Sequence, residues 1–186
     1  MTEINYLIPD YYSKFTCIAD RCPITCCQEW KIGVDADTNR KWKKLQAPET
    51  VPEQKKNLIA YTIKKDGQRV IGLDSDHRCP FLNSEKLCRL VVAYGDKVLS
   101  ETCTTFPREE HRFPTHNEKM LMPCCPAVID LWNKQKSLHF PNVSDTLSDT
   151  SDTDTSVLFL LREKLLNLLD DSSRTIEEEL LESFYI

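Results

Sequence analysis

Nine cysteines dominate the chemistry that this 186-residue chain can offer. Four of them form a tight N-terminal group with the spacing Cys17-x₄-Cys22-x₃-Cys26-Cys27. The others follow much later, at Cys79, Cys88, Cys103, Cys124 and Cys125. The N-terminus has no basic segment followed by an apolar one, so no secretory signal is indicated, and a reducing compartment disfavours disulfides. A thiolate-ligated metal site is therefore the first hypothesis.

The spacing of the cysteines narrows the kind of metal site without fixing it. Soft thiolates select zinc, copper(I) or iron–sulfur clusters, and four thiolates suffice for a tetrahedral zinc or a four-iron cluster. The C-x₂-C pair of zinc fingers is absent, and the adjacent pair Cys26-Cys27 favours a cage built from loops. The C-x₃-C-x₂-C pattern of radical enzymes is not matched either, because Glu29 occupies the third position. Zinc or iron, and one site or two, stay open.

Two further interpretations of the cysteines compete with metal binding. Free cysteines are often small buried hydrophobes, although the clustering around Cys26 exceeds what core packing needs. An extracellular disulfide scaffold is disfavoured by the missing signal and by the odd number of cysteines.

Composition excludes some classes of partner. The chain has 29 acidic and 24 basic residues, a formal net charge of -5, and no long Lys/Arg run, so we expect no nucleic-acid partner. No apolar window approaches the ~18 residues of a membrane-spanning helix. We therefore expect a soluble, cytoplasmic protein.

The organisation predicted from sequence is a cysteine-rich metal-binding domain at 1–141, a linker at 142–156 and a helical hairpin at 157–186. The linker is rich in Ser, Thr and Asp and has little to bury. The apolar run Val157–Leu169 predicts a buried helix, and Thr175 with Glu178 forms a candidate capping box for a second. These two helices cannot enclose a core alone, so they are predicted to begin a longer helical region.

Local signals place several elements in the cysteine-rich body. They predict a short strand at Lys31–Asp35, a helix from Asp37 to Leu45, a helix opening at Thr50, a hairpin over Tyr61–Leu73 turning at Asp66-Gly67, and a helix over Arg89–Leu99. The predicted fold is α+β and mostly helical. It is a loop-rich cysteine body around a metal site with a small hairpin, followed by a C-terminal helical pair.

Five motifs occur in a fixed order along the body. They are Cys22-x₃-Cys26-Cys27-x₂-Trp30-x-Ile32-x-Val34-Asp35, Cys79-Pro-Phe-Leu82, Leu87-Cys88-Arg89-Leu90, Leu99-Ser-x-Thr-Cys103-x-x-Phe-Pro-Arg108 and Cys125-Pro126-Ala127. Together they resemble the flagellin lysine-N-methylase family over roughly Tyr11 to Trp132. The later motifs are also similar to a wider group of zinc- or iron-chelating domains.

The resemblance implies a cytoplasmic bacterial enzyme that methylates lysine ε-amino groups of flagellin with S-adenosylmethionine. It also implies a cysteine-bound metal, a [4Fe-4S] cluster, with zinc as the alternative. The ligands that it implies are Cys17, Cys22, Cys26, Cys27, Cys79, Cys88, Cys103 and Cys125. Cys124 departs from the family pattern and is interpreted as a spare thiol.

Family members continue for a long helical portion beyond the segment that matches Ile176–Leu181. The chain therefore resembles a truncated relative, and a non-catalytic zinc- or iron-binding module is the alternative function. Its four glycines, Gly33, Gly67, Gly72 and Gly95, are isolated, so any pocket for S-adenosylmethionine is predicted to be non-Rossmann. No catalytic base is identified.

Other polar and aromatic residues have two interpretations each. His77 could be a ligand or proton shuttle, but is more often a loop residue, and His111, His116 and His139 show no metal spacing. Arg89 and Arg108 could neutralise an anionic cluster or form surface ion pairs. Trp30 and Trp42 could line a pocket, although core packing is the commoner role.

Overall fold

The computed structural model describes residues 5–114, 116–135, 153–169 and 173–185. The chain divides into two compact units. The larger unit comprises Asp10–Glu109 and Met120–Leu138, and the smaller unit comprises Met1–Pro9, Glu110–Lys119 and His139–Ile186. The prediction of an α+β fold is confirmed, with helices contributing more described residues than strands.

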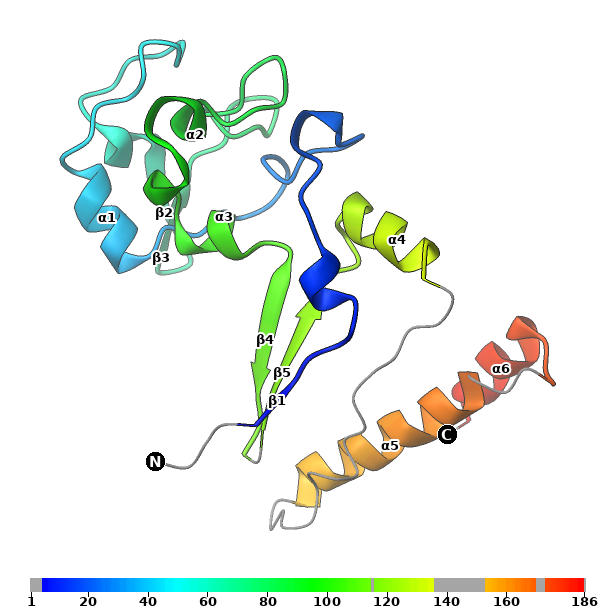
Figure 1. The fold of residues 1–186 in the computed structure, drawn as a ribbon. Coiled ribbons are helices and arrows are strands. Elements are labelled where there is room, and N and C mark those ends of the chain that lie inside the picture. Colours follow the sequence, from blue (N-terminus) through cyan, green and yellow to red (C-terminus); the bar gives the residue numbers. More distant parts are fainter. Residues whose placement is uncertain (1–4, 115, 136–152, 170–172, 186) are drawn as a thin grey trace. The chain divides into compact units, whose positions relative to one another are not determined.

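The larger unit combines short helices with one hairpin (Figure 1). Its elements are α1 (Ala36–Trp42), β2 (Thr62–Lys65), β3 (Gln68–Ile71), α2 (Arg89–Tyr94), α3 (Glu101–Thr105) and α4 (Pro126–Asn133). Strands β2 and β3 pair antiparallel, with Lys65 opposite Gln68. The turn residues Asp66 and Gly67 have φ angles of 50° and 76°, as a tight hairpin turn requires. The predicted hairpin is therefore confirmed.

Three predicted elements differ in extent. The strand at Lys31–Asp35 is reduced to a single bridge between Gly33 and Val70 beside β3. Helix α1 ends at Trp42, short of the predicted Leu45. Helix α2 ends at Tyr94 because Gly95 adopts a φ of 75°, and a 3₁₀ turn at Asp96–Val98 then leads to α3.

The helix predicted to open at Thr50 does not form. The segment is a series of turns in which the Gln54 side chain donates to the carbonyls of Pro48 and Val51, at 2.9 and 2.7 Å. The Tyr61 hydroxyl closes the segment by donating to the Glu53 carbonyl at 2.6 Å. Side-chain bonds to turn carbonyls here replace the helical ladder.

Two hydrophobic cores organise the larger unit. The first core contains Ile32, Val34, Trp42, Ala47, Val51, Leu58, Tyr61, Ile71, Cys79, Phe81, Leu90 and Val98. The second core contains Tyr11, Phe15, Leu121, Cys125, Ala127 and Val128. Trp42 is a core residue whose indole N–H donates to the Val98 carbonyl at 2.8 Å, so the packing role is the one that the structure supports.

The smaller unit contains residues of a three-stranded sheet that sequence reasoning did not predict. The strands are β1 (Tyr6–Leu7), β4 (Arg108–Arg112) and β5 (Asn117–Leu121), in the order β1-β5-β4. Strand β1 pairs parallel to β5, with Tyr6 opposite Asn117. Strand β1 is only two residues long and pairs with a strand far away in the sequence. It is therefore too short to show the alternating hydrophobic pattern by which a strand is predicted.

Helices α5 (Thr153–Leu169) and α6 (Ile176–Ser183) complete the smaller unit. Helix α5 begins inside the segment predicted as linker, and residues 142–152 of that segment lie outside the described residues. The apolar run was expected to be buried, but Phe159 is 5% exposed whereas Leu158 is 63% exposed. The capping box of Thr175 and Glu178 is confirmed. None of the described helices is long and apolar enough to cross a bilayer.

One buried polar network joins α5 to the sheet within the smaller unit. The Arg162 guanidinium donates to both carboxylate oxygens of Glu118, at 2.7 and 2.8 Å. His116 lies 3.1 Å from Glu118 and stacks on Phe113 with ring centroids 5.0 Å apart. Burial acts to raise the pKa of Glu118, but hydrogen bonds from Arg162 and His116 outweigh it and lower that pKa.

Candidate metal centre

All nine cysteines lie in the larger unit, and each carries a free thiol. The structure therefore does not support the alternative of a disulfide scaffold. The cysteines differ in exposure: Cys79 and Cys125 are buried, Cys17, Cys26 and Cys124 are exposed, and the rest are half-buried.

The first thiol group consists of Cys27, Cys79, Cys88 and Cys103. Cys79 is part of the first core, and the other three pack against that core. The backbone N–H of Cys79 donates to the Cys27 carbonyl at 2.8 Å, and an isolated bridge joins Leu82 to Cys88. Burial raises the pKa of the Cys79 thiol, and the three neighbouring thiols raise it further. Four cysteines from distant positions in the sequence thus gather at one core.

The second thiol group consists of Cys17, Cys22 and Cys125. Cys125 belongs to the second core, and Ile18, the neighbour of Cys17, packs against the same core. Burial raises the pKa of Cys125, and the thiols of Cys22 and Cys17 contribute in the same direction. Cys124 is exposed, and the described contacts of neither core include it.

Cys26 is the neighbour of Cys27 in the sequence and interacts with it through the side chain. The Cys26 thiol hydrogen-bonds to the Cys27 sulfur, which stabilises the Cys27 thiolate and lowers the pKa of Cys27 to about 7. The same hydrogen bond raises the pKa of Cys26. Burial and weaker electrostatic effects from Cys17 and Cys103 act on the pKa of Cys26 in the same direction.

Short helices position several of the cysteines. Cys88 and Cys125 are the N-cap residues of α2 and α4, where backbone N–H groups of the first turn point toward their sulfurs. Ser100 caps α3, and its buried hydroxyl accepts from the Cys103 N–H at 3.3 Å. Burial is the largest effect on the Cys88 and Cys125 thiols and raises the pKa of both, while the backbone donors of the helix N-termini act in the opposite direction.

Asp35 connects the start of α1 to the start of α3. Its Oδ1 accepts from the Thr38 N–H at 2.9 Å, and its Oδ2 accepts from the Thr38 hydroxyl at 2.7 Å and the Glu101 N–H at 2.9 Å. Burial acts to raise the pKa of Asp35, but these hydrogen bonds outweigh it and hold the pKa well below its usual range. The motif aspartate therefore fixes the helix that carries Cys103.

Trp30 and Gly33 hold the loop around the N-terminal cysteines. The Trp30 indole N–H donates to the Cys26 carbonyl at 2.6 Å, and its ring lies 5.3 Å from the Phe106 ring. A side chain at Gly33 would come within 2.9 Å of the Thr102 hydroxyl, next to Cys103. Trp30 is thus a packing residue that ties the cysteine loop to the end of α3.

The two candidate arginines have different surroundings. The Nε of Arg89, beside Cys88, is buried and has no hydrogen-bond partner among the described residues. Arg108 is exposed and lies over the rings of Tyr12 and Phe15, at 5.8 and 5.1 Å. Arg108 therefore makes cation–π contacts, whereas Arg89 is a buried donor available for an anion.

The histidines do not join the thiol groups. His77 is exposed on a turn with a φ of 59°, 3.5 Å from the Glu29 carboxylate, which agrees with the loop interpretation. His116 belongs to the Glu118 network, His111 lies on β4, and His139 lies outside the described residues.

As they stand, the described residues contain no three Cys, His, Asp or Glu side chains placed to hold one metal ion. The donor set nevertheless fits a cysteine-ligated metal in kind. All nine cysteines are free thiols, four of them gather at the first core, and the buried Arg89 Nε lacks the acceptor that an anionic cluster supplies.

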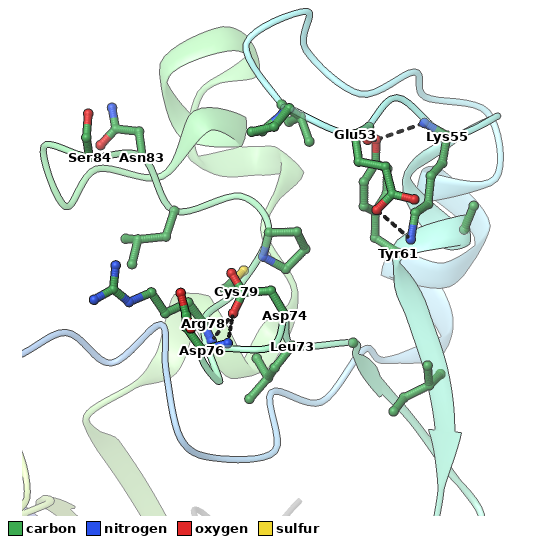
Figure 2. Close-up of a pocket in the computed structure, with 17 residues that line it drawn as sticks. Glu53, Lys55, Tyr61, Leu73, Asp74, Asp76, Arg78, Cys79, Asn83 and Ser84 are labelled. Carbon is green, nitrogen blue, oxygen red and sulfur yellow. Dashed lines mark hydrogen bonds and ion pairs between the residues drawn. The ribbon is translucent and has the colours of Figure 1, made fainter.

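A cavity of about 450 Å³ adjoins the first thiol group, and Cys79 forms part of its wall. Apolar wall atoms come from Val51, Leu73, Pro80 and Leu82 among others. Figure 2 shows Glu53, Lys55 and Tyr61 on one side of the cavity and Asp74, Asp76 and Arg78 on the other. This volume is typical of small-molecule and cofactor pockets.

Sequence reasoning missed the residues of this pocket. Asp74 is partly structural, since its Oδ1 accepts from the N–H groups of Asp76 and Arg78 at 2.9 and 2.8 Å. That turn presents exposed Asp76 and Arg78 side chains at the pocket. The only local signal was the cluster Asp74-Ser-Asp-His-Arg78 before Cys79, which is also typical of a plain loop.

The fold and the site define a cysteine-rich α+β protein with a candidate thiolate metal centre beside a cofactor-sized pocket. No family model and no solved structure matches the chain. Curated relatives do match. The chain is 31% identical over 139 residues to the flagellar biosynthetic protein FliU of Salmonella muenchen, covering 69% of this chain and 76% of that protein. It therefore belongs to the flagellin lysine-N-methylase (FliU) family.

Two longer relatives carry the name lysine-N-methylase. The protein from Salmonella choleraesuis (strain SC-B67) is 31% identical over 174 residues, and the one from Salmonella typhimurium (strain LT2) is 28% identical over 182 residues. Each alignment covers 90% of this chain but 42% of the relative. The chain thus spans less than half the length of these two methylases.

Proposed function

We propose that this chain is a cytoplasmic, S-adenosylmethionine-dependent protein lysine N-methyltransferase that acts on flagellin and carries a cysteine-ligated [4Fe-4S] cluster. The observation that carries the proposal is the match to lysine-N-methylases over 90% of this chain. The free thiols and the pocket beside Cys79 supply chemical support.

Eight cysteines would hold the metal, with Cys124 as a spare thiol. Binding of a metal by several thiolates is coupled to local folding, because the bound metal holds together the chain segments that carry its ligands. Arg89 would donate its unpaired Nε to the anionic centre, as outer-shell donors commonly do. We assign the centre a structural or cofactor-positioning role.

We place S-adenosylmethionine in the pocket beside Cys79. When bound, it supplies an electrophilic methyl group to a neutral amine, and the lysine proton must leave first. The Arg78 guanidinium would grip the carboxylate of the cofactor. Asp76 and Glu53 would face its cationic groups or its ribose hydroxyls, while Leu73 and Leu82 would cover apolar parts of the adenosine.

Calorimetric titration of the purified full chain with S-adenosylmethionine tests this assignment. We expect binding, and Arg78→Gln should weaken it about tenfold, which corresponds to about 1.4 kcal/mol. Arg40→Gln, at an exposed position of α1 outside the pocket, is the matched control. Equal affinity in both variants would reject the pocket, and no binding by the wild-type chain would reject the methyltransferase proposal.

The second candidate function is a non-catalytic zinc- or iron-binding module. It is favoured by one observation, namely that all nine cysteines are free thiols and that Cys27, Cys79, Cys88 and Cys103 gather at one core. This candidate predicts bound metal without affinity for S-adenosylmethionine. Incubation with flagellin and S-adenosylmethionine, followed by peptide mass spectrometry for methylated lysine, separates the two functions.

A further inference from the structure

We infer that the exposed side of helix α6 is a docking site for an amphipathic helix of another protein, one whose apolar stripe is flanked by Lys or Arg. Such docking goes beyond the proposed methyl transfer and does not depend on it. The docking site lies in the smaller unit, which contains none of the nine cysteines.

Helix α6 is amphipathic, but its apolar side is the exposed one. Ile176, Leu180 and Phe184 recur every four residues and therefore lie along one side of the helix, here called the α6 stripe. These three residues are 64%, 51% and 85% exposed. Glu179 is 8% exposed, so the buried side of α6 carries a carboxylate instead. A helix that buries its apolar side within its own unit has the opposite arrangement.

Helix α5 packs beside α6 in the same unit and also leaves apolar residues uncovered (Figure 1). Phe159 is buried and contacts the His116 ring, which attaches α5 to the sheet. Val157, Leu158 and Leu160 are exposed, and residues at these spacings point in different directions around a helix axis. A helix with apolar residues on several sides is typical of one that is covered on several sides. The pair α5–α6 therefore has apolar surface for a further helix.

The charge around this apolar surface favours one kind of occupant. The smaller unit holds about half of the chain's 29 acidic residues but only about a fifth of its 24 basic residues. Glu177 is exposed and, at a spacing of three and four residues, is the surface neighbour of Leu180 and Leu181. On α5, the exposed Glu163 lies three residues from the exposed Leu160. Negative charge therefore flanks the apolar residues of both helices.

Most of the basic residues near the α6 stripe are already paired. Arg162 donates to both carboxylate oxygens of Glu118, and Arg174 pairs with Glu182. Lys164 is the other basic residue between positions 153 and 185. Two copies of this surface would bring like charges together, and an anionic lipid surface would be repelled. A helix with Lys or Arg on both sides of its apolar stripe complements the apolar residues and the charge together.

A binding titration of the full chain with designed peptides tests the inference. The probe is a fluorescein-labelled helical peptide of about five turns, with Leu along one side and Lys on both flanks, and the matched peptide has Glu in place of Lys. We expect fluorescence anisotropy to show binding of the Lys peptide and about tenfold weaker binding of the Glu peptide. Added salt should weaken binding of the Lys peptide, because exposed charges are screened. Equal binding of both peptides, or no binding of the Lys peptide, would overturn the inference.

Two paired substitutions locate the binding on α6. Leu180→Gln with Phe184→Gln removes apolar residues of the α6 stripe and should weaken binding of the Lys peptide about tenfold. Val92→Gln, at an exposed apolar position of α2, is the matched control and should leave binding unchanged. Glu163→Lys with Glu177→Lys keeps the stripe and should reverse the preference in favour of the Glu peptide. Far-UV circular dichroism checks that each variant is folded, and binding that neither pair alters would overturn the inference.

Two measurements without peptide address the other occupants. Sedimentation velocity tests for a second copy, and co-sedimentation with vesicles of phosphatidylcholine and phosphatidylglycerol tests for a lipid surface. We expect neither kind of association. A dimer or a vesicle complex that is lost in Leu180→Gln with Phe184→Gln would assign the surface to that occupant and overturn the inference. The titration with S-adenosylmethionine is unaffected by these outcomes, so the docking site and the proposed function can fail separately.

Discussion

Replacing Asp35 by alanine is the sharpest test of how this fold positions its cysteines. The substitution removes the acceptor of three hydrogen bonds, from the Thr38 N–H, the Thr38 hydroxyl and the Glu101 N–H. Thr38 is 2% exposed, so its groups cannot recover all of their bonds from water. Loss of an N-cap costs about 1 kcal/mol, and a further hydrogen bond to a charged group costs about 1.5–3 kcal/mol.

Because Asp35 is itself only half-buried, we expect the combined loss in the free energy of unfolding to be about 2–3 kcal/mol. Urea denaturation of the reduced, metal-free chain measures it. Asp37→Ala is the matched control, since Asp37 lies on the same helix and its carboxylate pairs with Arg40 at the surface. An exposed pair of this kind is worth about 0.5 kcal/mol.

The pH dependence of the stability difference between wild type and Asp35→Ala is a second, independent test of this prediction. The pKa of Asp35 is lower in the folded chain than in the unfolded chain, where it is about 3.9. The bonds therefore contribute fully above that unfolded value, and their contribution is lost as the pH falls through the folded value. The difference between wild type and Asp35→Ala should shrink in acid. The reasoning would be refuted if Asp35→Ala were as stable as Asp37→Ala at pH 7. It would also be refuted if the stability difference between wild type and Asp35→Ala did not change in acid.

Two further predictions concern the thiol pair and the smaller unit. In the reduced, metal-free chain, alkylation of Cys27 followed by peptide mass spectrometry should show a midpoint of about pH 7, and Cys26→Ala should raise it; midpoints near 9 in both would contradict the hydrogen bond. Arg162→Met should lower stability by about 2 kcal/mol because it removes both Arg162 hydrogen bonds to the buried Glu118 carboxylate and leaves that carboxylate its contact with His116, whereas Lys164→Met at an exposed site of α5 should have little effect. Hydrogen exchange of α5 measures this, and equal exchange in the two variants would count against the ion pair.

Local signals in the sequence were sufficient where the deciding contacts span a few residues. Asp66-Gly67 predicted the hairpin because a two-residue hairpin turn needs positive φ at both residues, which Asp-Gly tolerates well. Thr175 and Glu178 predicted a capping box because both of its bonds lie within three residues. The helix expected at Thr50 failed for the opposite reason, since the Tyr61 hydroxyl binds the Glu53 carbonyl from outside the local window.

The sequence by itself determined the chemical type of the candidate site. The number, spacing and motif order of the cysteines indicated a thiolate metal centre and the flagellin lysine-N-methylase family, because ligand identity is a property of residue type. Only the tertiary structure decided which thiols are neighbours. Cys27 and Cys79 meet through a backbone hydrogen bond across 52 positions, and Asp35 reaches Glu101 across 66. Such contacts between distant residues depend on how the segments pack around the two cores. The local hydrophobic pattern of the sequence does not show this packing.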